Sequence, residues 1–212
     1  MLVKEIFSSI QGESSYSGIP CFFIRTSGCN LRCRWCDTVY AYEGGKEYSV
    51  DDLETYVRES AFPLVSLTGG EPLLQEDSIS FLTRIASMRD KIVLLETNGS
   101  ISLKDVDERV IKVVDVKCPS SGEAKSFLNE NLSYLGKKDE LKFVIADRED
   151  YEWATNFIEK NKASNLCKIL YSPIIDKMDM SKLVQWILDD KLNVRFQIQL
   201  HKIIWKKGKR GV

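Results

Sequence analysis

Short apolar segments rich in β-branched residues recur along this chain, and helical patterns separate most of them. This alternation favours parallel strands joined by crossover helices. Seven segments qualify as strands, which is too few for a closed eight-stranded barrel of about 250 residues. The pattern therefore predicts an α/β fold, an incomplete (partial) TIM-like β/α barrel of mainly parallel strands. We expect one domain that spans residues 1–212.

The strand candidates carry polar and glycine-rich residues mainly at their C-terminal ends, at 26–28, 68–71 and 97–99. Ligands of parallel α/β folds bind at these ends, so we expect the functional site there. Ser49 is the expected N-cap of the first helix. The expected strands cover 19–26, 64–67, 92–96, 110–116, 141–145, 168–171 and 194–198. The expected helices cover 50–59, 77–88, 151–160 and 181–190.

Charge and hydropathy exclude several classes of protein. The chain has 30 Lys and Arg against 31 Asp and Glu, whereas proteins that coat nucleic acid or an anionic membrane need a clear basic excess. No apolar run approaches the ~18 residues of a transmembrane helix. Lys4 and Glu5 stand where a signal peptide would build its apolar core. We therefore expect a cytoplasmic protein that binds neither nucleic acid nor a membrane.

The six cysteines are distributed unevenly. Three of them fall within eight residues and form a Cys-x3-Cys-x2-Cys motif: Cys29, Cys33 and Cys36. Disulfides are not expected in a reducing cytosol, and three thiolates at this spacing suit iron or zinc. Three ligands leave one metal position open, whereas a structural zinc site needs a fourth, for which Cys21 or Cys118 is a candidate. Outside the motif we expect buried core residues: Cys21, Cys118 and Cys167.

A second motif begins 33 residues after Cys36, at the end of the expected strand 64–67. It reads Gly69-Gly70-Glu71-Pro72, and glycine lets the backbone approach a ligand closely. With Trp35 before the third cysteine, the two motifs resemble the radical S-adenosylmethionine (radical SAM) superfamily. The resemblance implies a 4Fe–4S cluster held by the three cysteines, with S-adenosylmethionine on the remaining iron. It also implies reductive cleavage of S-adenosylmethionine to methionine and a 5′-deoxyadenosyl radical.

Further segments narrow the resemblance. They are Ile10-Gln11-Gly12-Glu13, Arg25, Asp37-Thr38 and the C-terminal Gln199-Leu200-His201-Lys202. Over essentially the whole chain they resemble the 7-carboxy-7-deazaguanine synthase family, which serves queuosine and 7-deazapurine biosynthesis. That family converts 6-carboxy-5,6,7,8-tetrahydropterin to 7-carboxy-7-deazaguanine with loss of ammonia, and Mg²⁺ supports the rearrangement. The resemblance also implies a homodimer, with a reductant such as a flavodoxin or ferredoxin as the electron donor.

The same resemblance implies which residues contact each ligand. A carboxylate such as Glu13 or Glu96 can accept the N–H donors of a pterin's guanidine-like edge, and Arg25 can offer the pterin carboxylate a bidentate fork. Thr38 is implied as the magnesium ligand through its hard hydroxyl oxygen. The implied substrate contacts are Ile10, Gln11, Gly12, Glu13, Arg25, Thr68, Glu96 and the one histidine, His201. The implied S-adenosylmethionine contacts are Trp35, Cys36, Asp37, Gly70, Asp115, Val116, Lys117, Tyr171, Ser172, Pro173 and Ile174.

Some of these positions depart from the family pattern or have a structural alternative. The family usually has Ser-Pro-Lys where this chain has Asp115-Val116-Lys117, and glycine is common at the position of Ser14. Without the resemblance, Arg25 also fits a salt bridge at the barrel rim. Thr38 also fits a loop cap, and His201 also fits a hydrogen-bonded structural role.

Two other functions are compatible with parts of the sequence. A glycyl-radical activating enzyme, which acts on a partner protein, shares the cysteine spacing and the small size. It would not need the segment 10–13 or Arg25 for a small anionic heterocycle. A non-catalytic iron–sulfur or zinc-binding module would leave the motif at 69–72 unexplained. The basic run at 206–210 is either a solvated end or an attractor of an anionic substrate.

Overall fold

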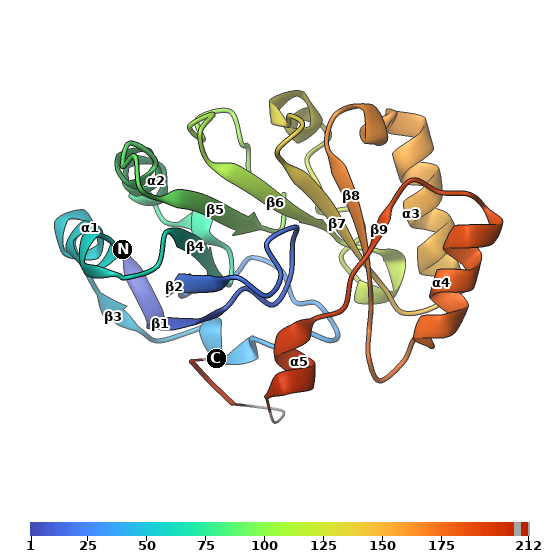
Figure 1. Ribbon diagram of the computed structural model, residues 1–212, viewed down its shortest axis with the longest axis horizontal. Helices are drawn as coiled ribbons and strands as arrows, with labels where there is room; N and C mark the ends of the chain where they lie inside the picture. Colours follow the sequence, from blue (N-terminus) through green and yellow to red (C-terminus); the bar gives the residue numbers. More distant parts are fainter. Residues whose placement is uncertain (206–208, 212) are drawn as a thin grey trace.

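One curved sheet organises the molecule (Figure 1). The computed structural model describes residues 1–205 and 209–211, so residues 206–208 of the basic run and Val212 lie outside the described residues. The nine strands in the described part are β1 (Leu2–Ile10), β2 (Pro20–Thr26), β3 (Lys46–Glu47), β4 (Leu64–Gly69), β5 (Ile92–Thr97), β6 (Ile111–Val116), β7 (Glu140–Ile145), β8 (Lys168–Pro173) and β9 (Arg195–Phe196). The α-helices are α1 (Val50–Glu59), α2 (Ser78–Ala86), α3 (Arg148–Asn161), α4 (Met180–Asp189) and α5 (Leu200–Ile204). Five short 3₁₀ helices join them in the described chain: η1 (Val39–Ala41), η2 (Pro72–Leu74), η3 (Pro119–Ser121), η4 (Asn129–Tyr134) and η5 (Ala163–Asn165).

The strands lie in the order β3-β1-β2-β4-β5-β6-β7-β8-β9. All neighbours from β2 to β9 pair in parallel, while β1 runs antiparallel to both β2 and β3. Within the described chain the two edge strands, β3 and β9, do not pair with each other, so the sheet curves without closing (Figure 1). The expected incomplete β/α barrel of mainly parallel strands is confirmed.

The main hydrophobic core lies between the outer face of the sheet and helices α1 to α4 (Figure 1). Alternation along β7 shows how a strand serves both faces: Leu141, Phe143 and Ile145 are fully buried in this core, so Lys142 faces the concave side. Burial of each such apolar side chain contributes roughly 1.5–3 kcal/mol. A smaller apolar cluster fills the concave side near the strand starts: Cys21, Phe23, Leu64, Leu94 and Ile111.

Helix starts follow their capping residues. The first helix covers the predicted residues, and its N-cap Ser49 accepts a bond from the Asp52 N–H while the Asp52 carboxylate accepts one from the Ser49 N–H. Helix α3 begins at Arg148, earlier than predicted, because the Asp147 side chain caps it by accepting from the Asp150 N–H. The sequence pattern alone did not reveal this cap.

The predicted strands differ from the structure mainly at β1, β3 and β9. Strand β1 and the two-residue β3 were not predicted, because Leu2–Ile10 mixes charged and polar residues with apolar ones and lies near the edge of the sheet. The last strand is shorter than the predicted 194–198. After Phe196 the chain leaves the sheet, and the N–H of Leu200 donates to the carbonyl of Gly12 at 2.9 Å.

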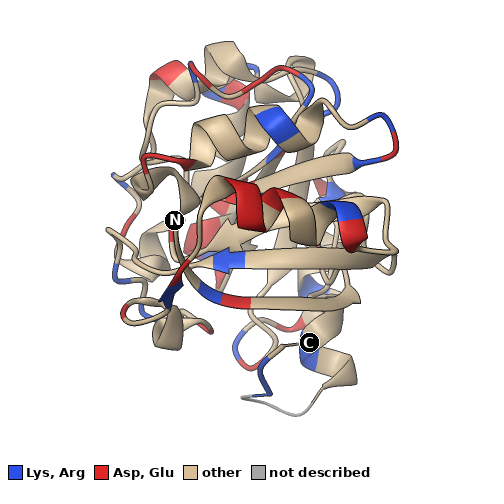
Figure 2. Ribbon diagram, turned by 90° about the vertical axis from the view of Figure 1, so that its left-hand side faces the viewer, with Lys and Arg blue, Asp and Glu red and all other residues tan. Residues whose placement is uncertain are grey.

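The cysteines outside the motif are core residues, as expected. All three cysteines outside the motif are at most 5% exposed and lie in the two apolar clusters: Cys21, Cys118 and Cys167. Ser14 has a φ of 65°, a left-handed conformation that suits the glycine common at this position. Basic and acidic residues are interspersed on the side of the molecule that carries α1 (Figure 2), in keeping with the balanced charge. None of the described helices has the length and apolar character needed to cross a bilayer.

Candidate active site

The cysteine motif forms a loop at the carboxyl end of β2. Its three cysteines are partly exposed: Cys29, Cys33 and Cys36. Two hydrogen bonds from backbone N–H groups of this loop tie it to the segment after β6. The Arg32 N–H donates to a Glu123 carboxylate oxygen at 2.7 Å, and the Arg34 N–H donates to the Ser121 carbonyl at 3.1 Å. The loop is therefore held across the carboxyl ends of the strands, where the sequence predicts the functional site.

The glycine motif packs directly against the cysteine loop. A Cβ at Gly70 would lie 2.1 Å from the carbonyl oxygen of Gly28 and 2.8 Å from the Cβ of Cys29, so no side chain fits there. The N–H of Glu71 donates to the same Gly28 carbonyl at 2.8 Å. The fully buried carboxylate of Glu71 accepts from the Asn98 N–H at 2.7 Å, and burial raises its pKa. These contacts join the ends of β2, β4 and β5 into one support for the loop.

The donor set of the loop fits an iron–sulfur cluster better than a structural zinc. A structural zinc would need a fourth ligand, and both candidates are buried in the apolar clusters: Cys21 is 0% exposed and Cys118 is 1% exposed. A 4Fe–4S cluster can be held by the three cysteines of the loop alone. Burial raises the pKa of Cys33 to about 11, although the Lys117 ammonium opposes this. Binding of iron therefore releases a proton from this thiol.

Polar side chains from β4, β5 and the segment after β1 meet around Glu96 on the concave face. Its carboxylate accepts bonds from the Gln11 Nε2 at 2.9 Å, the Ser66 hydroxyl at 3.0 Å and the Thr68 hydroxyl at 3.0 Å. Gln11 follows β1, Ser66 and Thr68 lie on β4, and Glu96 lies on β5. Three predicted substrate contacts thus share one hydrogen-bond network.

A second network crosses the concave face from Glu13 to Lys117. The Lys142 ammonium bonds Glu13 and lies 3.0 Å from the Asp115 Oδ2, which lies 3.1 Å from the Lys117 Nζ. The Gln199 side chain donates to the other oxygen of Glu13. Burial raises the pKa values of Glu13 and Asp115, but the neighbouring ammonium groups outweigh it and hold both below their usual range. Both carboxylates therefore stay ionised at neutral pH.

The C-terminal segment reaches the end of the cysteine loop. Asp37 Oδ2 lies 2.8 Å from the Lys202 Nζ and 4.0 Å from the His201 Nε2. Desolvation raises the pKa of Asp37, but the nearby His201 and the ion pair with Lys202 hold the pKa well below its usual range. The Thr38 hydroxyl donates to the Asp37 Oδ1 at 2.9 Å and makes no capping bond to the 3₁₀ helix Val39–Ala41. Thr38 thus stands at the N-cap position, where its carbonyl accepts from the Ala41 N–H at 2.8 Å, but its hydroxyl does not cap the helix.

His201 also packs on the segment after β1. A Cβ at Gly12 would lie 2.3 Å from the His201 Nδ1, so glycine is required for this approach. The structure thus brings Gly12 and His201 together at the open side of the sheet. Ile10 ends β1 opposite Pro20, with Gln11 and Gly12 directly after it.

Seven of the residues expected to bind S-adenosylmethionine, 115–117 and 171–174, lie at or directly after the ends of β6 and β8. Of the other four, Gly70 follows β4, and the rest lie on the cysteine loop: Trp35, Cys36 and Asp37. Within the described chain, Asp115 Oδ1 and Ser172 Oγ are buried without a hydrogen-bond partner. An unpaired buried polar atom costs about 1–3 kcal/mol, so both oxygens indicate a position for a ligand or water. The Val116 and Tyr171 side chains instead pack among the outer core, where the Tyr171 hydroxyl lies 3.1 Å from that of Thr155. Only the backbone of these two residues can reach the concave side.

The remaining predicted contacts of S-adenosylmethionine connect β8 to the cysteine loop. Pro173 ends β8, and the Ile174 N–H donates to the Ile145 carbonyl at 2.9 Å. Three residues further on, the Lys177 Nζ lies 5.1 Å from the centre of the Trp35 ring. The segment after β8 therefore covers part of the loop.

Arg25 enters the concave face from β2. Its Nε donates to the Glu5 Oε1 at 2.7 Å, so the predicted alternative of a salt bridge is present. The same Glu5 oxygen accepts from the Tyr40 hydroxyl at 2.6 Å. Sequence reasoning missed both Glu5 and Tyr40, since Glu5 belongs to the unpredicted β1.

Two further residues of the concave face were missed. Lys142 is the one charged residue of the predicted strand 141–145, and this charge among apolar neighbours was the available signal. Gln197 is 6% exposed, and neither atom of its amide has a hydrogen-bond partner within the described chain. The backbone N–H of Gln197 donates to the Tyr171 carbonyl at 2.9 Å, which places Gln197 beside Ser172. Gln197 falls within the predicted strand 194–198, but the sequence did not mark it as a site residue.

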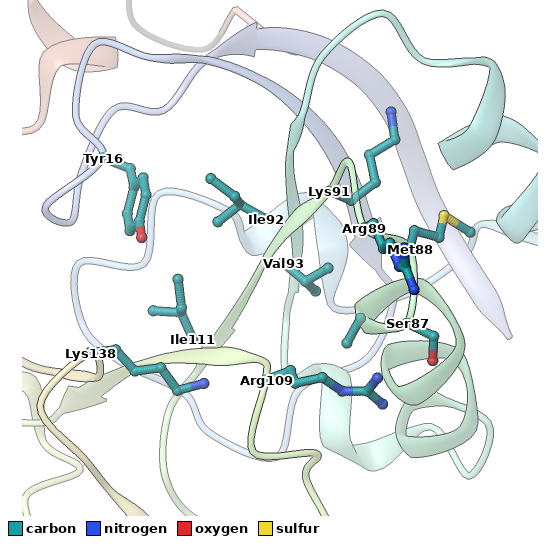
Figure 3. A pocket seen from close by; sticks show the side chains of 11 residues that line it. Tyr16, Ser87, Met88, Arg89, Lys91, Ile92, Val93, Arg109, Ile111 and Lys138 are labelled. Carbon is teal, nitrogen blue, oxygen red and sulfur yellow. The ribbon is translucent and has the colours of Figure 1, made fainter.

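A cavity of about 570 Å³ lies at the opposite end of the sheet, near the starts of β5 and β6 (Figure 3). Three of its four cations already bind the protein: Arg109 bonds Asp107 through two nitrogens, Lys138 donates to the Val110 carbonyl at 2.8 Å, and Lys91 donates to the Ser60 carbonyl at 2.9 Å. None of the predicted site residues lines this cavity. We therefore assign the functional site to the carboxyl end of the sheet and not to this cavity.

Known proteins resemble this chain in sequence and in fold. Residues 23–120 match the model of the radical SAM superfamily. The chain is 44% identical to the 7-carboxy-7-deazaguanine synthase of Koribacter versatilis, with 100% of both chains covered. It is 42% identical to the 7-carboxy-7-deazaguanine synthase of Thermoplasma acidophilum, with 97% of both chains covered. The crystal structure of QueE from Escherichia coli has the same fold, with a TM-score of 0.78 at 22% identity over 94% of both chains.

Proposed function

The chain belongs to the 7-carboxy-7-deazaguanine synthase family of the radical SAM superfamily, and we propose from this premise how its residues share the reaction. It is a lyase of queuosine biosynthesis that uses a 4Fe–4S cluster, S-adenosylmethionine and a small-molecule substrate. The proposed substrate is 6-carboxy-5,6,7,8-tetrahydropterin, which loses ammonia to give 7-carboxy-7-deazaguanine. The activating-enzyme and binding-module alternatives have no support from the relatives.

In this proposal the loop cysteines hold the cluster, and one domain over residues 1–212 carries the whole site. When bound, the cluster and S-adenosylmethionine supply the one-electron cleavage that yields a 5′-deoxyadenosyl radical. Gly70 packs against Gly28 and Cys29, and its N–H donates to the Thr26 carbonyl, so its own carbonyl oxygen is the proposed acceptor for the amino group of S-adenosylmethionine. The unpaired oxygens of Asp115 and Ser172 offer acceptors to the same ligand.

The concave face suits the two ends of a carboxypterin. Glu96 and Glu13 are acceptors for the pterin's N–H edge, and the bonds from Gln11 and Thr68 fix the orientation of Glu96. Arg25 binds the substrate carboxylate through a bidentate fork. Because Lys142 and Gln199 already bond Glu13, this carboxylate exchanges or shares partners when substrate enters.

Mg²⁺ belongs to the proposal at Thr38. Its hydroxyl makes one bond, to Asp37, which leaves oxygen lone pairs for a hard cation beside substrate oxygens and water. His201 contacts substrate from the open side of the sheet, where it already packs on Gly12. The proposal also includes a homodimer, a cytoplasmic location, no nucleic-acid or membrane partner, and a flavodoxin or ferredoxin as reductant.

The observation that carries the proposal is the seating of the cysteine loop on Gly70, directly above a concave face lined by Arg25, Glu96 and Glu13. The decisive experiment is anaerobic incubation of the reconstituted enzyme with S-adenosylmethionine, reductant and the carboxypterin. Mass spectrometry should detect 7-carboxy-7-deazaguanine and 5′-deoxyadenosine. Formation of 5′-deoxyadenosine without the deazaguanine would reject this substrate while leaving the radical chemistry in place.

Cysteine variants test the cluster ligands separately. Alanine at Cys29, Cys33 or Cys36 should abolish the brown chromophore and all cleavage of S-adenosylmethionine, because each removes one of three iron ligands. The matched control is Cys118→Ala, which removes a buried core thiol. Iron and sulfide analysis of the purified proteins measures both. Loss of iron from the Cys118 variant would contradict the three-cysteine assignment.

A further inference from the structure

We propose that Glu5 and Tyr40 are positioning residues that hold Arg25 for the substrate carboxylate, an inference that rests on the proposed function. One oxygen of Glu5 accepts from the Arg25 Nε at 2.7 Å and from the Tyr40 hydroxyl at 2.6 Å. The side chains of Glu5 and Arg25 are 17% and 16% exposed, so the pair is largely shielded from water. The three residues come from β1, β2 and η1 and meet at this one oxygen.

The bond to Nε decides which edge of the guanidinium remains available. Arg25 has five N–H donors in a rigid plane, and Glu5 engages only the one on Nε. The two terminal nitrogens have no acceptor among the described residues, and they form the fork that binds a carboxylate bidentately. The Phe7 ring, whose centre lies 5.7 Å from the guanidinium carbon, limits rotation of that plane. Glu5 therefore directs the free fork and leaves it open.

A β-bulge places Glu5 on the concave face. Val3 pairs with Thr26 and Glu5 pairs with Arg25, so Lys4 is an extra residue in β1. In a regular strand Val3 and Glu5 would face the same side. Here Val3 lies in the outer core, while Phe7, two residues beyond Glu5, packs against the concave cluster. The irregularity turns Glu5 from the helix side to Arg25, and bulges near active sites commonly re-aim a side chain in this way.

Tyr40 links this pair to the end of the cysteine loop. It lies in η1, two residues after Thr38. Its hydroxyl is a neutral donor that orients Glu5 without removing the negative charge that faces Arg25. The opposite arrangement, a second cation on Glu5, would draw the carboxylate away from Arg25. The Tyr40 bond therefore sets the carboxylate plane, and with it the direction of the Arg25 fork.

Steady-state kinetics of the holoenzyme test this inference. Glu5→Ala should raise the KM for the carboxypterin about tenfold with a smaller change in kcat, because a charge-assisted bond that orients the fork is lost. Glu5→Gln keeps an acceptor oxygen and should recover part of this loss. Tyr40→Phe should give a smaller increase. Two competitive inhibitors, 6-carboxypterin and pterin without the carboxylate, report on the fork directly. Only 6-carboxypterin contacts the Arg25 fork, so the difference in affinity between the two inhibitors should disappear in the Glu5 variants.

The double variant with Arg25→Met separates positioning from a merely structural role. If Glu5 acts through Arg25, adding Glu5→Ala to Arg25→Met should raise KM no further. Additive increases in KM would overturn the inference. So would an equal loss of affinity for 6-carboxypterin and pterin in Glu5→Ala. So would a normal KM in Glu5→Ala when Arg25→Met is impaired, and that result would leave the proposed function standing. A normal KM in Arg25→Met would reject the proposed carboxylate contact and the inference with it. Matched controls are Glu47→Gln on β3 and Tyr56→Phe on α1, both exposed.

Discussion

At the scale of single residues, the concave face is a set of buried charges that depend on one another. Lys142 bonds Glu13 and contacts Asp115, and both carboxylates have pKa values below their usual range. The folded-state pKa of Glu13 lies below its ordinary value of 4.5. Its ionisation therefore stabilises the fold fully above that pH, and this contribution is lost as the pH falls through the folded-state pKa.

Replacing Lys142 by Met should invert this pH dependence. Glu13 loses its closest cation, so burial then raises its pKa and the ionised form destabilises the fold. We expect the free energy of unfolding to fall by about 3–5 kcal/mol at pH 8 and by clearly less at pH 5, where Glu13 begins to take up a proton. Urea unfolding of the cluster-free protein at both pH values measures the difference. Lys104→Met, which removes an exposed ammonium 3.9 Å from Asp105, is the control. An equal loss at both pH values would contradict the coupling.

Thr38 offers a test of the magnesium assignment. Thr38→Ala removes one oxygen ligand and leaves the cysteines in place. The magnesium concentration for half-maximal deazaguanine formation should rise about tenfold, while formation of 5′-deoxyadenosine falls less. The ratio of the two products is measured as magnesium is titrated. Thr55→Ala on α1 is the matched control, because that hydroxyl bonds only its own helix. Identical titration curves for the Thr38 variant and the parent would show that the metal is held elsewhere.

At the scale of elements, the strand ends and their loops must fit closely for the cysteine loop to hold its place. The approach of the Gly28 carbonyl to Gly70 permits no side chain. The buried Glu71 adds bonds to Leu73, Thr97 and Asn98, so that the turn after β4 and the end of β5 move as one unit. The position of the cysteines therefore depends on residues that are not themselves ligands.

Gly70→Ala should displace the cysteine loop. A Cβ 2.1 Å from a backbone oxygen forces the backbone to shift, so we expect a loss of about 1–3 kcal/mol in unfolding free energy and lower iron content after reconstitution. Gly136→Ala is the control, because its nearest non-neighbouring atom lies 3.8 Å from the added Cβ. That variant should be neutral or slightly stabilised. Thermal unfolding and iron analysis measure both. A fully loaded Gly70 variant would show that the loop does not need this close approach.

At the scale of the whole molecule, the sheet is open, and the C-terminal segment crosses the gap. Leu200 bonds Gly12, Gln199 bonds Glu13, and Lys202 pairs with Asp37. Helix α5 has no buried residue of its own. The segment is therefore held mainly by polar contacts to the site, and we expect it to open at a lower free energy than the central strands.

Hydrogen exchange tests this expectation. In the ligand-free enzyme, residues 197–205 should exchange faster than β4 to β7. Addition of S-adenosylmethionine and the carboxypterin should slow exchange in this segment, because its contacts with Gly12, Glu13 and Asp37 then enclose bound substrate. Helix α1, on the outer face, is the internal control and should not change. If residues 197–205 of the ligand-free enzyme were as well protected from exchange as the central strands, the expectation that this segment opens more easily would be wrong.

The sequence by itself determined the α/β alternation, the main helices and strands, and the family. These follow from local periodicity, caps such as Ser49 and short motifs such as the cysteine loop, which need no knowledge of distant contacts. It also brought forward Gln11, Glu96 and Arg25 as candidates for the site. Strand β1 was missed because its mixed composition has no clear period.

Only the tertiary structure decided which side chains share the concave face and what holds them. Glu5 reaches Arg25 through a bulge, and Lys142 lies between Glu13 and Asp115 although 129 residues separate it from Glu13. The direction of a side chain depends on strand register and on the neighbouring strand, and neither is encoded in a local pattern. The same holds for the packing of His201 on Gly12, since a C-terminal segment finds its partner only after the sheet has formed around the open side.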